Sequence, residues 1–249
     1  MEVKTENILT AYSANEKAAY LGALAALATA DRQANEEELG HLREIARSSG
    51  VSPEEERVII EAAKDTTGNN LKQCLDTLKG SDLKYSLITD FIALAKADES
   101  YTEDERGNIE KVARYLNVNQ NQFSVLDQFV NKAAEEEHTP EEFANPNFVK
   151  STGMQEKFAN AGLDVGAMGK SLFGFLGPLL LGSIAGKALG GKRGSGGLGG
   201  GLLGNMLGRA TTGGSGFPGG MGSLGSLISG LNKSRGNQSI GGMLGRLLR

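Results

Sequence analysis

Apolar residues recur at three- and four-residue spacings through the first 137 residues, which is the period of an amphipathic α-helix. Leu21, Leu24 and Leu27 mark such a face, and the many alanines beside them favour helix and close packing. The pattern predicts helices over 15–30, from Asn35 to Gly50, from Ser52 through Ala63, within 66–80, over 82–97, from Thr102 through Ala113, and from Asn119 to Glu137.

Polar residues at the predicted helix starts fit the same picture. Ser52-Pro53-Glu54-Glu55 supplies a capping side chain, a first-turn proline and acids beside the positive end of the helix dipole. Thr139-Pro140-Glu141-Glu142 predicts one more short helix, before Asn145-Pro146-Asn147 breaks the chain. Because no stretch alternates in the manner of a strand, the predicted fold class is all-α, a bundle of about seven helices.

The sequence repeats itself at a separation of 67 residues. The pattern Ala-x-Ala-Asp occurs at 28–31 and again at 95–98, and Asn35 with Glu38 corresponds to Thr102 with Glu105. The register continues through the pairs Ile45/Val112, Ala46/Ala113, Arg47/Arg114 and Val51/Val118. The repeat predicts two helical units, related by a pseudo-twofold axis, that close a shared core.

Two copies of Ala-x-Ala-Asp in register, each followed seven residues later by Glu, resemble the tellurite-resistance TerB-like family over residues 15–135. The family pattern has Gly after the Asp, where this chain has Arg32 and Glu99. The resemblance implies a compact helical domain of the bacterial cytoplasm, associated with stress responses and membrane-linked complexes. It also implies divalent-metal binding through acidic side chains, and no enzyme activity.

Two interpretations of the repeated acids stay open. Asp31, Glu38, Asp98 and Glu105 could together hold a divalent cation, since hard cations take several carboxylate oxygens. Helix capping explains the same residues without a metal, because each Glu stands three residues after a capping Asn or Thr. We favour capping, and a cation is the one cofactor that the sequence suggests.

Other sites are excluded on spacing. Counted from Asp31 or Asp98, the twelfth position of an EF-hand loop is Leu42 or Ile109, neither of which supplies the closing carboxylate. His41 and His138 have no zinc-like cluster around them, and no nucleophile has a local partner. Gly169-Lys170-Ser171 lacks the earlier glycine of a phosphate loop. We therefore expect no catalytic site.

Charge divides the chain near residue 165. Residues 1–165 hold 17 Lys and Arg against 30 Asp and Glu, a net charge of −13. From residue 166 onward there are 9 basic residues, no acid and 28 of the 36 glycines. We predict a helical domain at 1–137, a linker with a short helix at 138–165, and a basic Gly/Leu-rich tail at 166–249.

Cysteine usage and the first residues bear on location. Cys74 is the only cysteine, so no internal disulfide forms, and we interpret it as a small buried apolar residue. The start, MEVKTENILT, lacks the apolar core of a secretory signal. The expected location is the cytoplasm, with peripheral attachment at the inner face of the membrane.

The tail opens with an uncharged apolar segment, 172–186, that contains Pro178. It is shorter than the ~20 residues of a spanning helix and could cross a bilayer only if Lys170 and Lys187 snorkel. Glycines spaced by four, at 182, 186 and 190, suit close packing with a partner, self-association included.

Three short amphipathic peptides follow at 201–209, 222–231 and 240–249, separated by flexible Gly and Ser linkers. Together with the start of the tail they supply apolar anchors and basic ends for binding a membrane or a protein partner. The predicted binding residues are Leu172, Phe173, Phe175, Leu176, Leu202, Leu203, Met206, Leu207, Arg209, Leu227, Ile228, Leu231, Ile240, Met243, Leu244, Arg246, Leu247, Leu248 and Arg249.

The partner is inferred from tail chemistry. A net charge of +9 beside apolar anchors suits an anionic membrane surface or a membrane protein. The C-terminal peptides also resemble the loading peptides that hold cargo inside encapsulin shells, so docking into a shell or multimer is an alternative. No aromatic platform accompanies the charges, which disfavours nucleic acid. The leading hypothesis is a non-enzymatic stress-associated adaptor, with an assembly component and a divalent-metal sensor as alternatives.

Overall fold

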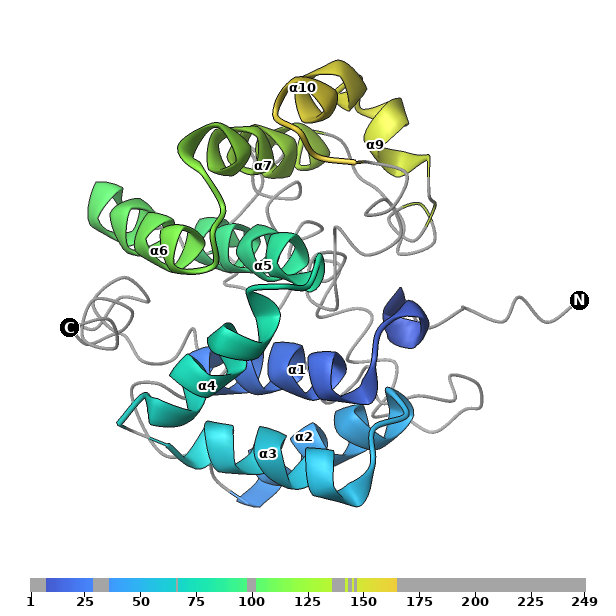
Figure 1. Cartoon of the computed structure of the whole chain (residues 1–249), viewed down its shortest axis with the longest axis vertical. Coiled ribbons are helices and arrows are strands. Elements are labelled where there is room, and N and C mark those ends of the chain that lie inside the picture. The colour runs from blue at the N-terminus through green and yellow to red at the C-terminus, as the bar shows by residue number, and fades with distance from the viewer. Residues whose placement is uncertain are drawn as a thin grey trace, which may run out of the picture.

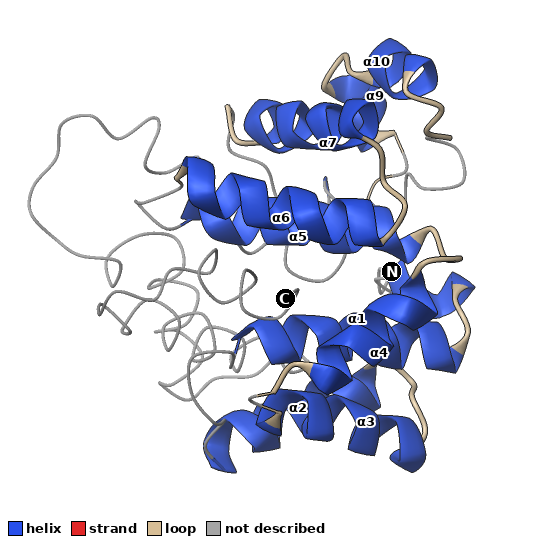
Figure 2. Cartoon of the chain, turned by 60° about the vertical axis from the view of Figure 1, so that its left-hand side comes forward, coloured by secondary structure: helices blue, strands red, loops and turns tan. Residues whose placement is uncertain are grey.

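The computed structural model describes residues 8–28, 36–65, 67–97, 102–135 and 147–164, together with Glu142 and Asn145. These residues form helices joined by short loops and contain no strand (Figure 2). The predicted all-α bundle is confirmed. In chain order the helices are the 3-10 helix η1 (Ile8–Ala11), α1 (Ala14–Ala28), α2 (Glu36–Ser48), α3 (Pro53–Lys64), α4 (Asn69–Leu78), α5 (Leu83–Ala97), α6 (Glu103–Tyr115), α7 (Gln120–Ala133), α9 (Phe148–Ser151) and α10 (Gln155–Asn160).

Two central helices organise the core. Residues 18–27 of α1 and 86–95 of α5 are buried without interruption, as expected of helices that are apolar around most of their circumference. Helix α1 packs against α3 and α4, while α5 packs against α6 and α7. The two central helices also contact each other, which joins the lower group of helices to the upper group (Figure 1).

The connections that follow α2 and α6 have the same geometry, 67 residues apart. Gly50 and Asn117 both take the left-handed conformation, with φ of 71° and 60°. The next residue then donates its N–H back to the last helical turn, from Val51 to Ala46 and from Val118 to Ala113. This helix ending favours Gly, which has no Cβ to clash at positive φ, or Asn, whose short polar side chain tolerates the left-handed conformation.

The helices that follow these connections also begin alike. Ser52 caps α3 and Asn119 caps α7, and each side chain accepts the N–H of the third helical residue. In return, Glu55 and Gln122 accept the backbone N–H of their caps, so both helices start with a capping box. The helix start predicted at Ser52 is confirmed.

After α7 the structure departs from the sequence pattern. The last predicted helix ends at Ala133 rather than at Glu137, because Ala134 closes it with hydrogen bonds to the carbonyls of Val130 and Asn131. Within the segment expected to be a linker, α9 and α10 pack onto the core through Phe148 and Phe158, both buried. Apart from Glu142, the short helix predicted from Thr139 lies outside the described residues.

The tail from residue 166 also lies outside the described residues, and with it every binding residue predicted there. Among the helices that the structure describes, none combines the length and the apolar character needed to cross a bilayer.

Candidate functional site

The second copy of the acidic motif leads into α6, and its Glu is a capping residue. Glu105 is 1% exposed, and its Oε2 accepts the backbone N–H of Thr102 at 2.9 Å. The hydroxyl of Thr102 accepts the N–H of Glu105 at 3.2 Å in return. The two residues therefore satisfy orphan N–H groups at the helix start, as the capping interpretation predicts.

The structure does not describe the side chains of the other three acids. Asp31 and Asp98 lie outside the described residues, and so does the side chain of Glu38, whose backbone belongs to α2. Among the described residues, no three His, Cys, Asp or Glu side chains gather as metal ligands would. The four-acid cation site therefore stays a prediction, with Glu105 as the member whose geometry is known.

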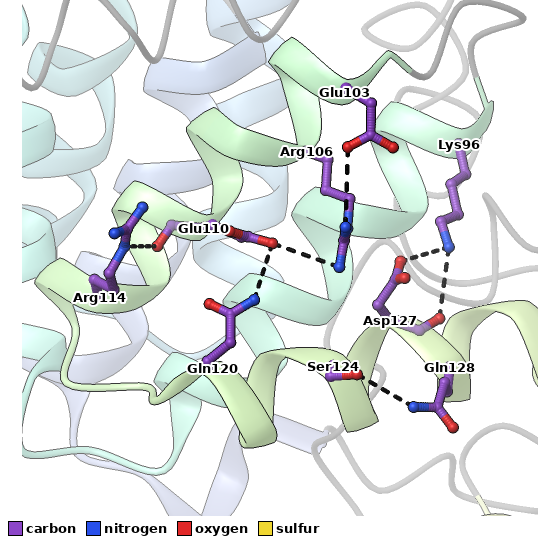
Figure 3. Close-up of polar contacts among 9 residues, drawn as sticks. All are labelled: Lys96, Glu103, Arg106, Glu110, Arg114, Gln120, Ser124, Asp127 and Gln128. Atoms are coloured by element: carbon purple, nitrogen blue, oxygen red, sulfur yellow. Dashed lines mark hydrogen bonds and ion pairs between the residues drawn. The ribbon is translucent and has the colours of Figure 1, made fainter.

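A partly buried lysine fixes the end of α5 two residues before Asp98. The Lys96 side chain is 12% exposed, and its Nζ lies 2.6 Å from Asp127 Oδ1 on α7 (Figure 3). The same ammonium donates to Asn131 Oδ1 at 2.6 Å, one helical turn further along α7. Because both partners lie on α7, these contacts fix the last turn of α5 against α7.

A second set of polar contacts joins α6 to α7 (Figure 3). Arg106 lies 3.5 Å from Glu110, whose Oε1 also accepts a hydrogen bond from Gln120 at 3.2 Å. The Arg106 guanidinium stands 5.8 Å from the centre of the Phe123 ring, a cation–π distance. Partly exposed pairs of this kind contribute modestly to stability, but they fix how the two helices align.

Sequence reasoning missed a buried polar pair between the two central helices. Tyr20 on α1 donates its hydroxyl to Asp90 Oδ2 on α5, and neither residue is exposed. A buried carboxylate needs such donors because burial removes its water. The available signal was a single acid inside the apolar stretch 87–92, where a helix face meant for the core has no other charge.

Cys74 lies in the core between α1, α3 and α4. It is 3% exposed, and burial raises the pKa of its thiol to about 11. A nucleophilic cysteine must be a thiolate, which this environment disfavours at neutral pH. The interpretation of Cys74 as a packing residue agrees with this burial.

A polar cluster at the surface connects α4 with α6. Asp76 Oδ1 accepts hydrogen bonds from Lys79 Nζ and from the Tyr115 hydroxyl, each at 2.7 Å. The Lys79 ammonium also stands 3.7 Å from the centre of the Tyr115 ring. The hydrogen bond from Lys79, followed by that from Tyr115, lowers the pKa of Asp76, and the bond to Asp76 raises the pKa of Tyr115.

Comparison with known proteins places this domain. The family model described as tellurite resistance protein TerB matches residues 5–128, a range that runs from before η1 into α7. Searches of curated proteins and of solved structures found no match. The matched range includes both copies of the acidic motif and the buried Tyr20–Asp90 pair. The helical domain of this chain belongs to the TerB family of tellurite resistance proteins.

Proposed function

We propose that this chain is a non-enzymatic adaptor of the tellurite-resistance type, whose basic tail attaches the helical domain to a membrane surface or a membrane protein. The observation that carries the proposal is the charge division near residue 165. An acidic domain of net charge −13 adjoins a tail of net charge +9 that contains no acid. The two parts therefore suit different partners.

The described polar groups support an adaptor because their partners lie within the fold. Glu105 caps α6, Lys96 binds α7, and Asp90 joins the central helices. Buried polar groups used in this way specify a rigid arrangement of helices. A rigid domain of this kind is suited to presenting a surface.

The tail supplies the attachment chemistry. Each of its three peptides carries Leu, Ile or Met anchors, and two of them end on arginines. A basic residue near an anionic bilayer contributes about 1 kcal/mol, and apolar side chains at the interface add to that attraction. Because the three peptides share one chain, their weak contacts combine into a higher overall affinity.

Vesicle flotation tests the membrane attachment. The full chain is compared with a chain ending at Asp164, which keeps the buried Leu163. We expect the full chain to float with vesicles of phosphatidylcholine and phosphatidylserine and to stay down with phosphatidylcholine alone. Added salt should weaken the binding, because surface charges are screened.

A matched variant separates charge from apolar attraction. It keeps all apolar tail residues and replaces the nine tail Lys and Arg with Gln. We expect this variant to lose most of its flotation with anionic vesicles. Equal flotation of the full chain and the chain ending at Asp164 would contradict attachment through the tail.

The repetition of short tail peptides supports a second candidate, docking into a shell or multimer. In that case the chain should copurify in a particle of fixed stoichiometry, and deletion of residues 240–249 should release it. Size-exclusion chromatography with light scattering measures the particle mass before and after the deletion. An unchanged particle without these residues would rule out this route of docking.

The repeated acids support a third candidate, a divalent-cation sensor. Isothermal titration with calcium, manganese and zinc should give heats that disappear in the double variant Asp31→Ala with Asp98→Ala. Glu103→Ala is the matched control, because this side chain is 92% exposed beside the second motif. Unchanged heats in the double variant would end this idea.

A further inference from the structure

Residues 147–163, which we call the α7 strap, pack against α7 beyond the range that matches the TerB family. Two aromatic rings hold it there. Phe158 stands edge-on to Phe129 of α7, with 5.3 Å between the ring centres. Phe148 approaches the same ring at 6.1 Å, again edge-on. One α7 side chain is thus the common anchor of both strap helices.

Two hydrogen bonds also join the strap to α7. Gln122 Nε2 donates to the carbonyl of Ala161 at 3.4 Å, and Lys157 Nζ donates to Gln128 Oε1 at 2.7 Å. Gln122 also belongs to the capping box of α7. The strap therefore contacts α7 from its first turn, at Gln122, to its middle, at Gln128.

The strap packs on a stripe of α7 beside the one that is turned toward α6, and Gln122 lies where they meet because its side chain also hydrogen-bonds Tyr85 of α5. Phe123, which lies beneath Arg106 of α6, belongs to the inner face. Gln122 and Phe129, which contact the strap, are seven residues apart and lie on one stripe with Val125. Val125 is 5% exposed. The ring of Phe129 would lose both of these aromatic neighbours if the strap were absent.

The strap has little structure of its own to keep it in place. Helix α9 has four residues and α10 has six, lengths at which an isolated helix does not persist in water. Each helix is followed by a glycine at positive φ, Gly153 at 70° and Gly162 at 71°. The strap conformation therefore depends on its contacts with α7.

We propose that the α7 strap releases from α7 as a unit while the rest of the bundle stays folded. Release separates Phe148 and Phe158 from α7, and it uncovers Phe129. The strap contacts alone carry this inference. Its consequence for the tail, a longer tether between domain and partner, rests on the proposed attachment.

Hydrogen exchange on the full chain, followed by mass spectrometry, tests the release. The amides of Phe158, Ala161 and Leu163 donate within the strap and report on it, while amides in α5 report on the core. We expect strap amides to exchange roughly 100-fold faster than α5 amides, and with a weaker dependence on denaturant. Exchange of both sets in step, with one denaturant dependence, would overturn the proposal.

A pair of variants tests the anchor. Phe158→Ala should speed strap exchange by at least about 10-fold and leave α5 exchange unchanged. Gln155→Ala, at an exposed site on the same short helix, should change neither. Equal acceleration of strap and α5 by Phe158→Ala would show one cooperative unit and contradict the proposal. Hydrogen exchange of the unaltered chain across denaturant concentrations tests strap release without any variant. Its result does not depend on whether the tail binds a partner.

Discussion

At the residue scale, the Tyr20–Asp90 pair is the most demanding contact in the described core. Asp90 is fully buried on α5, and a carboxylate in such a place loses the solvation that water would give it. The phenol of Tyr20 replaces part of that solvation. Because the two residues lie 70 positions apart, the same contact sets how α1 meets α5.

Tyr20→Phe tests this pair. The substitution keeps the ring and removes the donor, so we expect unfolding to become easier by about 1–3 kcal/mol in urea denaturation. Tyr115→Phe is the matched control, since it removes a hydroxyl that donates to Asp76 at an exposed site. That control should cost less than about 1 kcal/mol. Equal losses in the two variants would contradict the importance of burial.

A second residue-scale prediction concerns Gly22 on α1. A Cβ placed there would stand 2.9 Å from Cys74 Sγ, closer than atoms of the core tolerate. We expect Gly22→Ala to destabilise the protein by about 1–3 kcal/mol, and Cys74→Ala to recover part of that loss in the double variant.

Gly40→Ala provides the comparison for Gly22. A Cβ at Gly40 meets nothing within 4 Å, and the residue lies inside α2. Alanine should therefore stabilise that helix by roughly 0.5–1 kcal/mol. Thermal unfolding followed by circular dichroism measures both changes. A gain in stability from Gly22→Ala would show that α1, α3 and α4 pack less closely than described.

At the element scale, helix starts are stabilised by local pairs that can be tested singly. Thr102→Ala removes the cap of α6 and should cost about 1 kcal/mol of unfolding free energy. Thr77→Ala is a suitable control, because this threonine lies within α4 and bonds the carbonyl of Gln73. It should be nearly neutral or slightly stabilising. A neutral result for Thr102→Ala would contradict the capping interpretation of the second motif.

The contact between α4 and α6 should respond to pH. Hydrogen bonding lowers the pKa of Asp76 below its ordinary value of 3.8 in the folded protein. A lowered carboxyl pKa stabilises the fold above the unfolded value, and that stabilisation is lost as the pH falls through the folded pKa. Asp76→Asn should therefore lower the melting temperature at neutral pH, and the difference should shrink as the pH drops below 3.8.

Asp82→Asn is the control for that pH series, because Asp82 is exposed near the start of α5. The comparison consists of melting temperatures for the unaltered chain and both variants across the acidic range. A difference for Asp76→Asn that stays undiminished while the pH falls through and well below the lowered pKa of Asp76 would show that the effect is not carried by the charge.

At the scale of the whole molecule, the described core extends through the α7 strap. A chain ending at Asp164 keeps Phe148, Phe158 and Leu163, and we expect it to melt within about 2 °C of the full chain. A chain ending at Glu135 exposes Phe129, so it should lose roughly 2–4 kcal/mol. Differential scanning calorimetry compares the three. A large loss already at Asp164 would indicate that later residues contribute to the folded core.

The difference in stability between the central helices and the α7 strap is relevant to the proposed adaptor. The central helices form the rigid part, while the strap lies between that part and the tail. A domain that binds a partner through a distant tail benefits when the attachment point of that tail has a defined position. The proposed strap, when packed on α7, fixes where the tail is attached to the domain. When it is released, it lengthens the tether between the domain and the partner.

The sequence by itself determined the features that depend on neighbouring residues. Helix positions followed from apolar spacing, and the starts of α3 and α6 followed from Ser52 and Thr102 with the Glu three residues later. Family membership could also be inferred, since two motifs in register are visible without a structure. The charge division at 165 is likewise a property of composition alone.

Only the tertiary structure decided which distant residues meet. Nothing local shows that Asp90 finds Tyr20, that Lys96 finds Asp127, or that two phenylalanines beyond α7 pack on Phe129. A helical pattern states that a residue faces inward, but the partner depends on how whole helices cross. For this reason a segment that resembles a linker in the sequence becomes part of the core once α7 offers it an apolar face.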